Sequence, residues 1–166
     1  MTLTHARLTE LFLYDPTTGI FTRKVRTARR TKAGEQAGGT VVFGHIALKI
    51  DGRRYRAHRL AWFYVHAEWP EAIDHINGIP SDNRIANLRP CVQADNMKNC
   101  RKSKANTSGF KGVYALPGGR WRAMITADHK TISLGCYASK ELAADAYDKA
   151  AVKFHGEFAR TNQSLR

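Results

Sequence analysis

Residues 74–99, DHINGIPSDNRIANLRPCVQADNMKN, decide the fold and the chemistry of this chain. The stretch begins with an acid directly before a histidine, Asp74-His75, and continues with five asparagines, at positions 77, 83, 87, 96 and 99. A single asparagine commonly marks a turn, because its side chain bonds the nearby backbone. Five in so short a stretch indicate more than a turn.

An acid, a histidine and an amide suit the hydrolysis of a phosphodiester, which needs a base to activate water and a cation to stabilise the developing charge. Histidine titrates near neutrality, so His75 suits the first task. Mg²⁺ takes oxygen ligands and keeps several waters, so the carboxylate of Asp74 and the amide of Asn96 could bind it. Consecutive strand residues face opposite ways, so the acid and the histidine require a strand end or loop, which the turn at Asn77-Gly78 provides.

The rest of this stretch predicts two strands and a helix around one ion. Residues 84–90, RIANLRP, have room to form the second strand, and a helix that begins near Gln93 would return Asn96 to the site. Asn87, in the middle, is better placed to bond the backbone of the loop than to bind the ion. Turn residues rather than catalytic ones are expected at Asp82 and Asn83.

Four motifs follow one another in residues 56–99: H-R-L, D-H-I-x-G, D-N-R-x-x-N-L-R and a final D-N. In this order and spacing they resemble the HNH nucleases of the ββα-metal fold, especially the homing-endonuclease branch. The resemblance implies that His75 is the general base and that Asn87 is the middle asparagine of the catalytic motif. It also implies that Asp74 and Asn96 bind a catalytic Mg²⁺ or Mn²⁺. Zinc-stabilised members carry cysteine pairs, which this chain lacks, so no structural zinc is expected.

The charge of the chain favours a polyanionic partner. Its 166 residues carry 27 Lys+Arg and 14 Asp+Glu, a formal net charge of +13. Residues 1–96 hold 14 basic and 9 acidic side chains (+5) and residues 97–166 hold 13 and 5 (+8), so a basic tail does not explain the excess. Nucleic acid is the first candidate partner and an anionic membrane the second.

Cysteine usage and hydropathy limit the class of protein further. The three cysteines include no C-x-x-C pair, so they suggest neither a disulfide framework nor a four-cysteine zinc site. The sequence contains neither a run of about 18 apolar residues nor a signal-peptide core. A soluble protein in the reducing cytoplasm is therefore expected.

Upstream of the motifs the sequence predicts a helix over residues 3–13 and a strand over 19–25. The arginine-rich segment that follows is interpreted as a solvated loop, with a phosphate-contacting arm as the alternative. Residues 44–60 alternate in polarity around Asp51-Gly52, which is a strong hairpin signal.

A helix-compatible apolar cluster then ends before Pro70. Two histidines of this element, His58 and His66, are expected to be core or boundary residues rather than ligands. The helix is predicted to pack on the hairpin.

A second unit is predicted beyond residues 103–109, which are basic, polar and without apolar periodicity, as in a linker. Within residues 119–126, GRWRAMIT, apolar positions alternate with basic and polar ones, so the strand has one buried face and one basic face. The outward positions are Arg120, Arg122, Met124 and Thr126. With residues 111–120 and 131–137, this strand forms a three-stranded antiparallel sheet.

The chain then predicts a helix that Ser139 caps and Gly156 ends. Its apolar stripe is expected to run through every fourth residue, namely Leu142, Ala146, Ala150 and Phe154, flanked by Ala143, Tyr147 and Ala151. A face so rich in small residues should lie close against the sheet.

Short motifs in this unit are KGV at 111–113, RW at 120–121, LGCY at 134–137 and AADAYDKAAVKFHG at 143–156. With them, residues 106–162 resemble the plant ethylene-response-factor (APETALA-two) type DNA-binding domain, also found fused to HNH nucleases in phages and bacteria. The resemblance implies a sheet that lies in the major groove. The plant target sequence is not carried over, because several base-contacting positions differ. Residues expected to contact DNA are Lys111, Arg120, Arg122, Thr126 and Lys130, whereas Trp121 is expected in the core.

Together these patterns predict an α+β chain. Residues 1–102 form a ββα-metal HNH nuclease core with an N-terminal hairpin and helix extension, and a basic linker spans 103–109. A three-stranded antiparallel sheet packed on one helix spans 106–162. The expected function is that of a metal-dependent, homing-type DNA endonuclease that nicks sites located by the C-terminal domain.

The expected partner is double-stranded DNA, which the protein is expected to bind as a monomer or weak dimer. The expected location is the cytoplasm of a phage-infected or prophage-carrying bacterial cell. The chief alternative is a catalytically idle, sequence-specific DNA-binding regulator or accessory protein. A weaker alternative is a protein that binds or cuts RNA.

Overall fold

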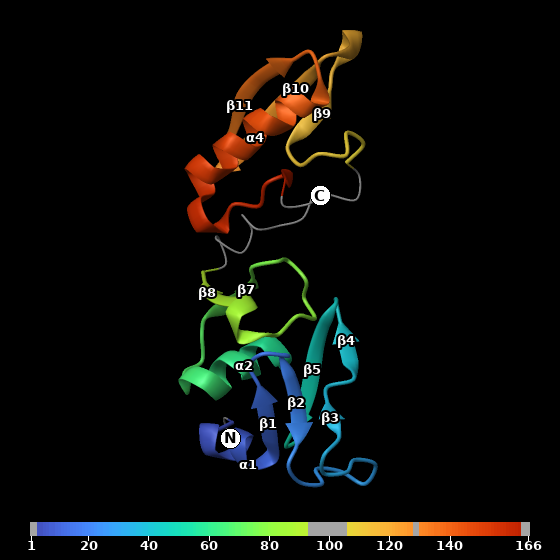
Figure 1. The fold of residues 1–166 in the computed structure, drawn as a ribbon, viewed down its shortest axis with the longest axis vertical. Helices are drawn as coiled ribbons and strands as arrows, with labels where there is room; N and C mark the ends of the chain where they lie inside the picture. Colours follow the sequence, from blue (N-terminus) through green and yellow to red (C-terminus); the bar gives the residue numbers. More distant parts are fainter. Residues whose placement is uncertain (1–2, 93–105, 128–129, 164–166) are drawn as a thin grey trace. The chain divides into compact units, whose positions relative to one another are not determined.

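The computed structural model divides the chain into two units, Met1–Gln93 and Ala94–Arg166 (Figure 1). It describes residues 3–92, 106–127 and 130–163. Short antiparallel sheets and helices occur in both units, so the predicted α+β class is confirmed. Among the described helices, none combines the length and hydropathy of a membrane-spanning segment.

The first unit begins with a helix and a three-stranded sheet. Its elements are α1 (His5–Leu11), β1 (Phe12–Asp15), β2 (Ile20–Arg23) and β3 (Gln36–Ala37), with strand order β1-β2-β3. Thr4 caps α1 by accepting a hydrogen bond from the Arg7 N–H at 3.2 Å. The helix predicted over 3–13 is therefore too long. Phe12 and Tyr14 are buried while Leu13 is exposed, and this alternation marks a strand.

A second sheet of order β4-β5-β6 follows, from β4 (Thr40–Val42), β5 (His45–Ile50) and β6 (Arg53–Arg56). The predicted hairpin is confirmed. Asp51 and Gly52 both have positive φ angles, 45° and 83°, which a two-residue turn of type I′ requires. Strands β3 and β4 were not predicted, because two or three residues are too few to show a period.

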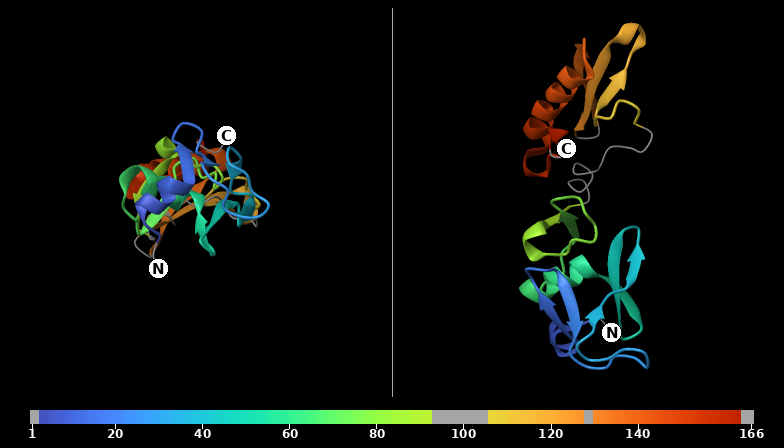
Figure 2. Two further views of the ribbon diagram at one scale, coloured as in Figure 1. Left: turned by 90° about the horizontal axis from the view of Figure 1, so that it is seen from below. Right: turned by 45° about the vertical axis from the view of Figure 1, so that its right-hand side comes forward.

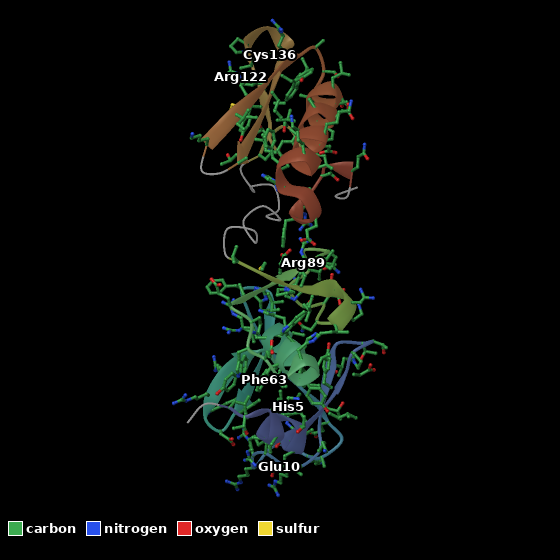
Figure 3. All side chains as sticks on the ribbon, turned by 90° about the vertical axis from the view of Figure 1, so that its left-hand side faces the viewer. His5, Glu10, Phe63, Arg89, Arg122 and Cys136 are labelled. Carbon is green, nitrogen blue, oxygen red and sulfur yellow. The ribbon has the colours of Figure 1, made fainter. Side chains whose placement is uncertain are left out.

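The helix α2 (Ala57–His66) carries the core of the first unit. Leu60, Ala61 and Phe63 are buried on it, and they join the buried aromatic rings of the first sheet in one cluster. His5 of α1 lies edge-on to Phe63 with ring centroids 5.7 Å apart (Figure 3). The helix thereby fixes the strands on which the candidate site is built.

The motif stretch forms a two-stranded antiparallel sheet from β7 (Ala72–His75) and β8 (Leu88–Cys91). In its register Asp74 lies opposite Arg89, and His75 lies opposite Leu88. The strand predicted over 84–90 starts later than expected, because Ile85–Asn87 form a 3₁₀ turn first. The helix predicted near Gln93 lies outside the described residues.

The second unit contains a three-stranded antiparallel sheet of order β11-β10-β9, covered on one face by a helix (Figure 2). Its elements are β9 (Val113–Ala115), β10 (Trp121–Ala127), β11 (Lys130–Tyr137) and α4 (Lys140–His155). The predicted alternation in β10 is confirmed, since Ala123 and Ile125 are buried and Arg122 and Thr126 are exposed. Trp121 packs against the core, also as predicted.

The buried stripe of α4 agrees with the predicted one only in part. Leu142 and Phe154 are 56% and 39% exposed, whereas Ala150 of the predicted stripe is buried together with the predicted flanking residues, Ala143, Tyr147 and Ala151. The cause lies directly before β9, where Gly112 lets the Tyr147 ring approach the backbone. A Cβ at Gly112 would lie 2.1 Å from Tyr147 Cδ2. The two ends of the helix agree with the prediction, because Ser139 Oγ accepts from the Leu142 N–H and Gly156 follows the last turn.

Replacing Gly112 by alanine is expected to destabilise the second unit by more than about 2 kcal/mol, because its positive φ of 72° and the contact with Tyr147 both oppose a Cβ. Gly118→Ala is the matched control, since Gly118 also has a positive φ, 77°, but a Cβ there would have no atom within 4 Å. Hydrogen exchange of β10 amides in the full chain measures the difference. Equal protection in both variants would contradict the close packing of Tyr147 on Gly112.

Candidate active site

The loop between β7 and β8 is held closed by the side chain of Asn87. Its Oδ1 accepts from the Asn77 backbone N–H at 3.0 Å, and its Nδ2 donates to the Asp82 carbonyl at 2.8 Å and to Asn77 Oδ1 at 3.0 Å. The backbone carbonyl of the same residue accepts from the Ile76 N–H at 2.9 Å. The predicted bonding of Asn87 to the loop backbone is confirmed, and the loop starts directly after His75.

Asn83 lies inside this loop and contacts His75. Its side chain is buried, with Oδ1 3.3 Å from His75 Nε2 and Nδ2 donating to the Ser81 carbonyl. Its backbone carbonyl accepts from the Tyr14 hydroxyl at 2.7 Å, and Gly19 packs directly on the backbone at 83–84. The N-terminal sheet therefore positions Asn83, for which the sequence predicts only a place in a turn.

The contact with Asn83 decides which nitrogen of His75 carries the proton. Because Asn83 Nδ2 donates to Ser81, Oδ1 faces His75 and accepts from its Nε2–H. In a neutral imidazole the lone pair is then on Nδ1. Burial lowers the pKa of His75, while the hydrogen bond with Asn83 and the charge of Asp74 act in the opposite direction. His75 is therefore neutral at pH 7 and able to accept a proton.

Asp74 has a different neighbour from His75. Arg89, its partner in the register, donates from Nε and Nη2 to Asp74 Oδ2 at 2.9 and 2.6 Å. The carboxylate is buried and the guanidinium is nearly so, with side chains 4% and 14% exposed. Arg89, labelled in Figure 3, was not predicted to take part in the site, although its motif position opposite Asp74 could have indicated it.

Two further histidines lie against His75. His58 of α2 has its ring centroid 4.9 Å from that of His75, and His45 of β5 has its centroid 5.6 Å away. His58 is buried, as predicted for a core residue, but no pattern in the sequence indicates that it faces His75. The same prediction was wrong for His66, which is exposed at the end of α2. His45 was not singled out at all, because strand alternation alone does not show which residue of another strand it meets.

The histidine cluster is electrostatically coupled. Burial is the main cause that lowers the pKa of His45 and brings the pKa of His58 down to about 3. The positive charge that a protonated neighbour would carry adds to the effect on both residues. The cluster therefore resists protonation near neutral pH.

The structure brings His75 and Asn87 together through the loop, and places Asp74 beside them on β7. The fourth predicted residue, Asn96, lies outside the described residues. Three of the four residues expected at the nuclease site therefore stand on the β7–β8 ribbon and its loop.

The residues expected to contact DNA lie on the second unit. Arg120, Arg122, Thr126 and Lys130 are exposed, and Arg122 lies opposite exposed Cys136 in the register (Figure 3). Lys111 differs from them, since it is half-buried, its backbone N–H donates to Asn162 Oδ1 at 2.6 Å, and its Nζ lies 6.0 Å from the Tyr147 ring centroid. Its backbone therefore ties the start of the sheet to the end of the chain.

Comparison with known proteins agrees with this geometry. A family model described as HNH endonuclease matches residues 55–98. Protein 3.8 of Escherichia phage T7 is 32% identical over 108 residues, which are 63% of this chain and 88% of the phage protein. The chain belongs to the same family as protein 3.8 and carries an HNH endonuclease domain. His58, His75, Asn83 and Asn87 all lie within the residues that the HNH family matches.

Plant proteins are similar to part of the chain. An AP2/ERF and B3 domain-containing protein of rice, Oryza sativa subsp. japonica, is 34% identical over 87 residues, which are 52% of this chain and 21% of the rice protein. The chain spans about a fifth of the length of that relative. The solved structure described as DNA binding and cleavage by the HNH homing endonuclease I-HmuI has a TM-score of 0.41 and 20% identity, covering 87% of this chain and 84% of that one.

The buried His58 of the HNH domain is expected to make stability depend on pH. Its pKa in the folded chain is about 3, against an ordinary value of 6.5, so below pH 6.5 the unfolded chain binds a proton that the folded chain does not. The free energy of unfolding should therefore fall as the pH falls from 6.5, by up to about 1.4 kcal/mol per pH unit for this one proton. His58→Gln should show a shallower decline in denaturant titrations between pH 7.5 and 5.

His66→Gln is the matched control, because His66 is exposed on the same helix. This variant should decline as steeply as the native chain. The same slope in His58→Gln and in the native chain would show that His58 is not buried in its neutral form.

Proposed function

We propose that the chain is a divalent-metal-dependent DNA endonuclease of the homing type, with His75 as the general base. The observation that supports this most is the environment of His75 in the HNH domain. Its imidazole is buried, Asn83 orients it, and the loop that follows it is pinned by Asn87. A base held in one tautomer and kept neutral is what the activation of water requires.

In the proposed reaction, Nδ1 of His75 accepts a proton from the attacking water. The resulting imidazolium is stabilised where it forms, because Asn83 Oδ1 accepts from Nε2 and the charge of Asp74 raises the pKa of the ring. Because the ring is buried, the low local dielectric constant strengthens both interactions. Asn87 acts indirectly, by fixing the loop that carries Asn83.

A divalent ion, when bound, supplies the charge that stabilises the phosphoryl and leaving oxygens. Asp74 and Asn96 are the residues that would hold it. Asp74 suits this role because a carboxylate supplies the oxygen ligand that Mg²⁺ prefers, and its buried charge is balanced by Arg89. A carboxylate with an amide oxygen suits Mg²⁺ or Mn²⁺ better than a metal that prefers sulfur or imidazole ligands. Arg89 holds the carboxylate in a fixed orientation.

We infer that the second unit is a DNA-binding domain of the APETALA-two type that locates the cleavage site. The partial similarity to AP2/ERF proteins of plants and the exposed basic face of its sheet support this assignment. The Arg122 guanidinium can grip guanine or phosphate in two places. One HNH site in each chain makes a nick in one strand the natural product.

His75→Ala is expected to lower the rate of plasmid nicking in Mg²⁺ by at least about 100-fold, because a positioned base typically contributes 10²–10⁴-fold. Conversion of supercoiled to open-circular DNA measures it. His66→Ala removes an exposed imidazole from the same unit and should cut at the native rate. Native cutting by His75→Ala would overturn the role of His75, and no cutting by the native chain in Mg²⁺ or Mn²⁺ would favour a catalytically idle DNA-binding protein.

Arg122→Ala is expected to weaken binding to duplex DNA and to lower the slope of log affinity against log salt by about 1, since one phosphate or base contact is lost. Lys153→Ala is the control of equal charge, because Lys153 is exposed on α4. Fluorescence anisotropy at several salt concentrations measures both variants. If both lose affinity equally, net charge rather than the sheet face governs binding.

A further inference from the structure

Three histidines from three separate elements converge in the first unit: His45 of β5, His58 of α2 and His75 of β7. The ring centroids of His45 and His58 lie 4.9 Å apart, and so do those of His58 and His75. One ring nitrogen from each of the three lies within 4.8 Å of the other two. Such convergence is not a consequence of core packing alone, because apolar side chains would fill the same space without polar atoms.

Among the described residues, two ring nitrogens of this cluster, one on His45 and one on His58, lack the partners that buried groups normally have. Within the described part of the chain, Nδ1 of His45 and Nδ1 of His58 are buried without a hydrogen-bond partner. Buried polar side chains usually have at least one, from protein, water or an ion. The Pro80 backbone, which can only accept, interacts with the His45 ring and so favours a proton on Nε2 and a lone pair on Nδ1.

The ligand set selects the class of ion. Three imidazoles with an open fourth position suit Zn²⁺ and related transition metals, whereas Mg²⁺ takes oxygen ligands. Zinc binds imidazole nitrogen at about 2.0–2.1 Å, which places ligand nitrogens about 3.4 Å apart in a tetrahedron. Since the three nitrogens already lie within 4.8 Å of one another, they need to approach by no more than about 1.4 Å to reach that value.

We propose that His45, His58 and His75 form a second metal site, which binds Zn²⁺ or another imidazole-preferring ion and thereby inhibits the nuclease. The binding site stands on the geometry of the cluster, while its inhibitory effect rests on the proposed function. A neutral imidazole has one lone pair. A zinc ion on His75 therefore occupies the lone pair that would accept the proton from water.

The second site differs from the proposed catalytic one in position and in chemistry. Asp74, the proposed Mg²⁺ ligand, bonds Arg89 and does not belong to the histidine cluster. Mg²⁺ and Zn²⁺ would therefore bind different side chains. An excess of Mg²⁺ should accordingly not displace zinc from the cluster. Asn83 would support the site, since the amide that bonds Nε2 of His75 fixes the ring orientation.

Binding is tested on the full native chain with zinc chloride alone. Isothermal titration should find one site, and X-ray absorption at the zinc edge should count three imidazole ligands. His45→Gln and His58→Gln should each lower the zinc affinity by at least about tenfold, because the loss of even an outer-shell partner of a metal ligand commonly costs 10–100-fold and each variant loses a direct ligand. His66→Gln, exposed on α2, should leave the affinity unchanged. Circular dichroism confirms that each variant is folded.

Inhibition is tested as a ratio within each protein, with Mg²⁺ present throughout. At a zinc concentration of ten times the dissociation constant, plasmid nicking by the native chain should fall about tenfold, since about one chain in eleven stays free. In His58→Gln, with a zinc affinity at least about tenfold lower, the ratio of rates with and without zinc should be about one half or higher at that same concentration. The His66→Gln chain should be inhibited like the native one.

The outcomes separate the site from the function. No zinc bound, or fewer than three imidazoles at the zinc edge in the native chain, would overturn the metal site. Zinc bound at the cluster with undiminished nicking would overturn the inhibitory role. A native chain that never cuts in Mg²⁺ or Mn²⁺ would overturn the proposed function and the inhibition together, while zinc titration would still decide whether the site exists.

Discussion

The hydrogen bonds of the Asn87 side chain are the constraint on which the rest of the site depends. One amide closes the loop after β7 by bonding the backbone at Asn77 and Asp82. Closing the loop buries Asn83, and Asn83 in turn orients the imidazole of His75. The Tyr14 hydroxyl supports the same loop from the N-terminal sheet, so residues far apart in the sequence share the task of holding one ring.

Elements that depend on local patterns could be predicted from the sequence. The Asp51-Gly52 hairpin, the alternation in β10 and the capped start of α4 follow from turn chemistry and periodicity. The buried stripe of α4 could be predicted only in part, because helical spacing fits two neighbouring stripes equally well and the contact between Gly112 and Tyr147 decides between them.

In the candidate site, too, the residues of one sequence motif could be predicted and those brought close by tertiary packing could not. Asp74, His75 and Asn87 stand in one motif, and the bonding of Asn87 could be inferred from it. The approach of His45 and His58 to His75 arises from the packing of a strand and a helix on β7, which no spacing in the sequence encodes. Buried titratable groups that gather in this way are candidates for function in their own right.

The pairing of β7 with β8 also limits how the chain can vary. Neighbouring residues on this short ribbon belong to different environments, Asp74 with Arg89 and His75 with the other imidazoles. Inserting or deleting one residue within either strand would turn its side chains to the opposite faces. Both the pairing of Asp74 with Arg89 and the contact of His75 with the other imidazoles would then be lost. The length of the intervening loop can therefore vary. Within the strands, only the insertion or deletion of an even number of residues keeps the acid and the imidazole on their present faces.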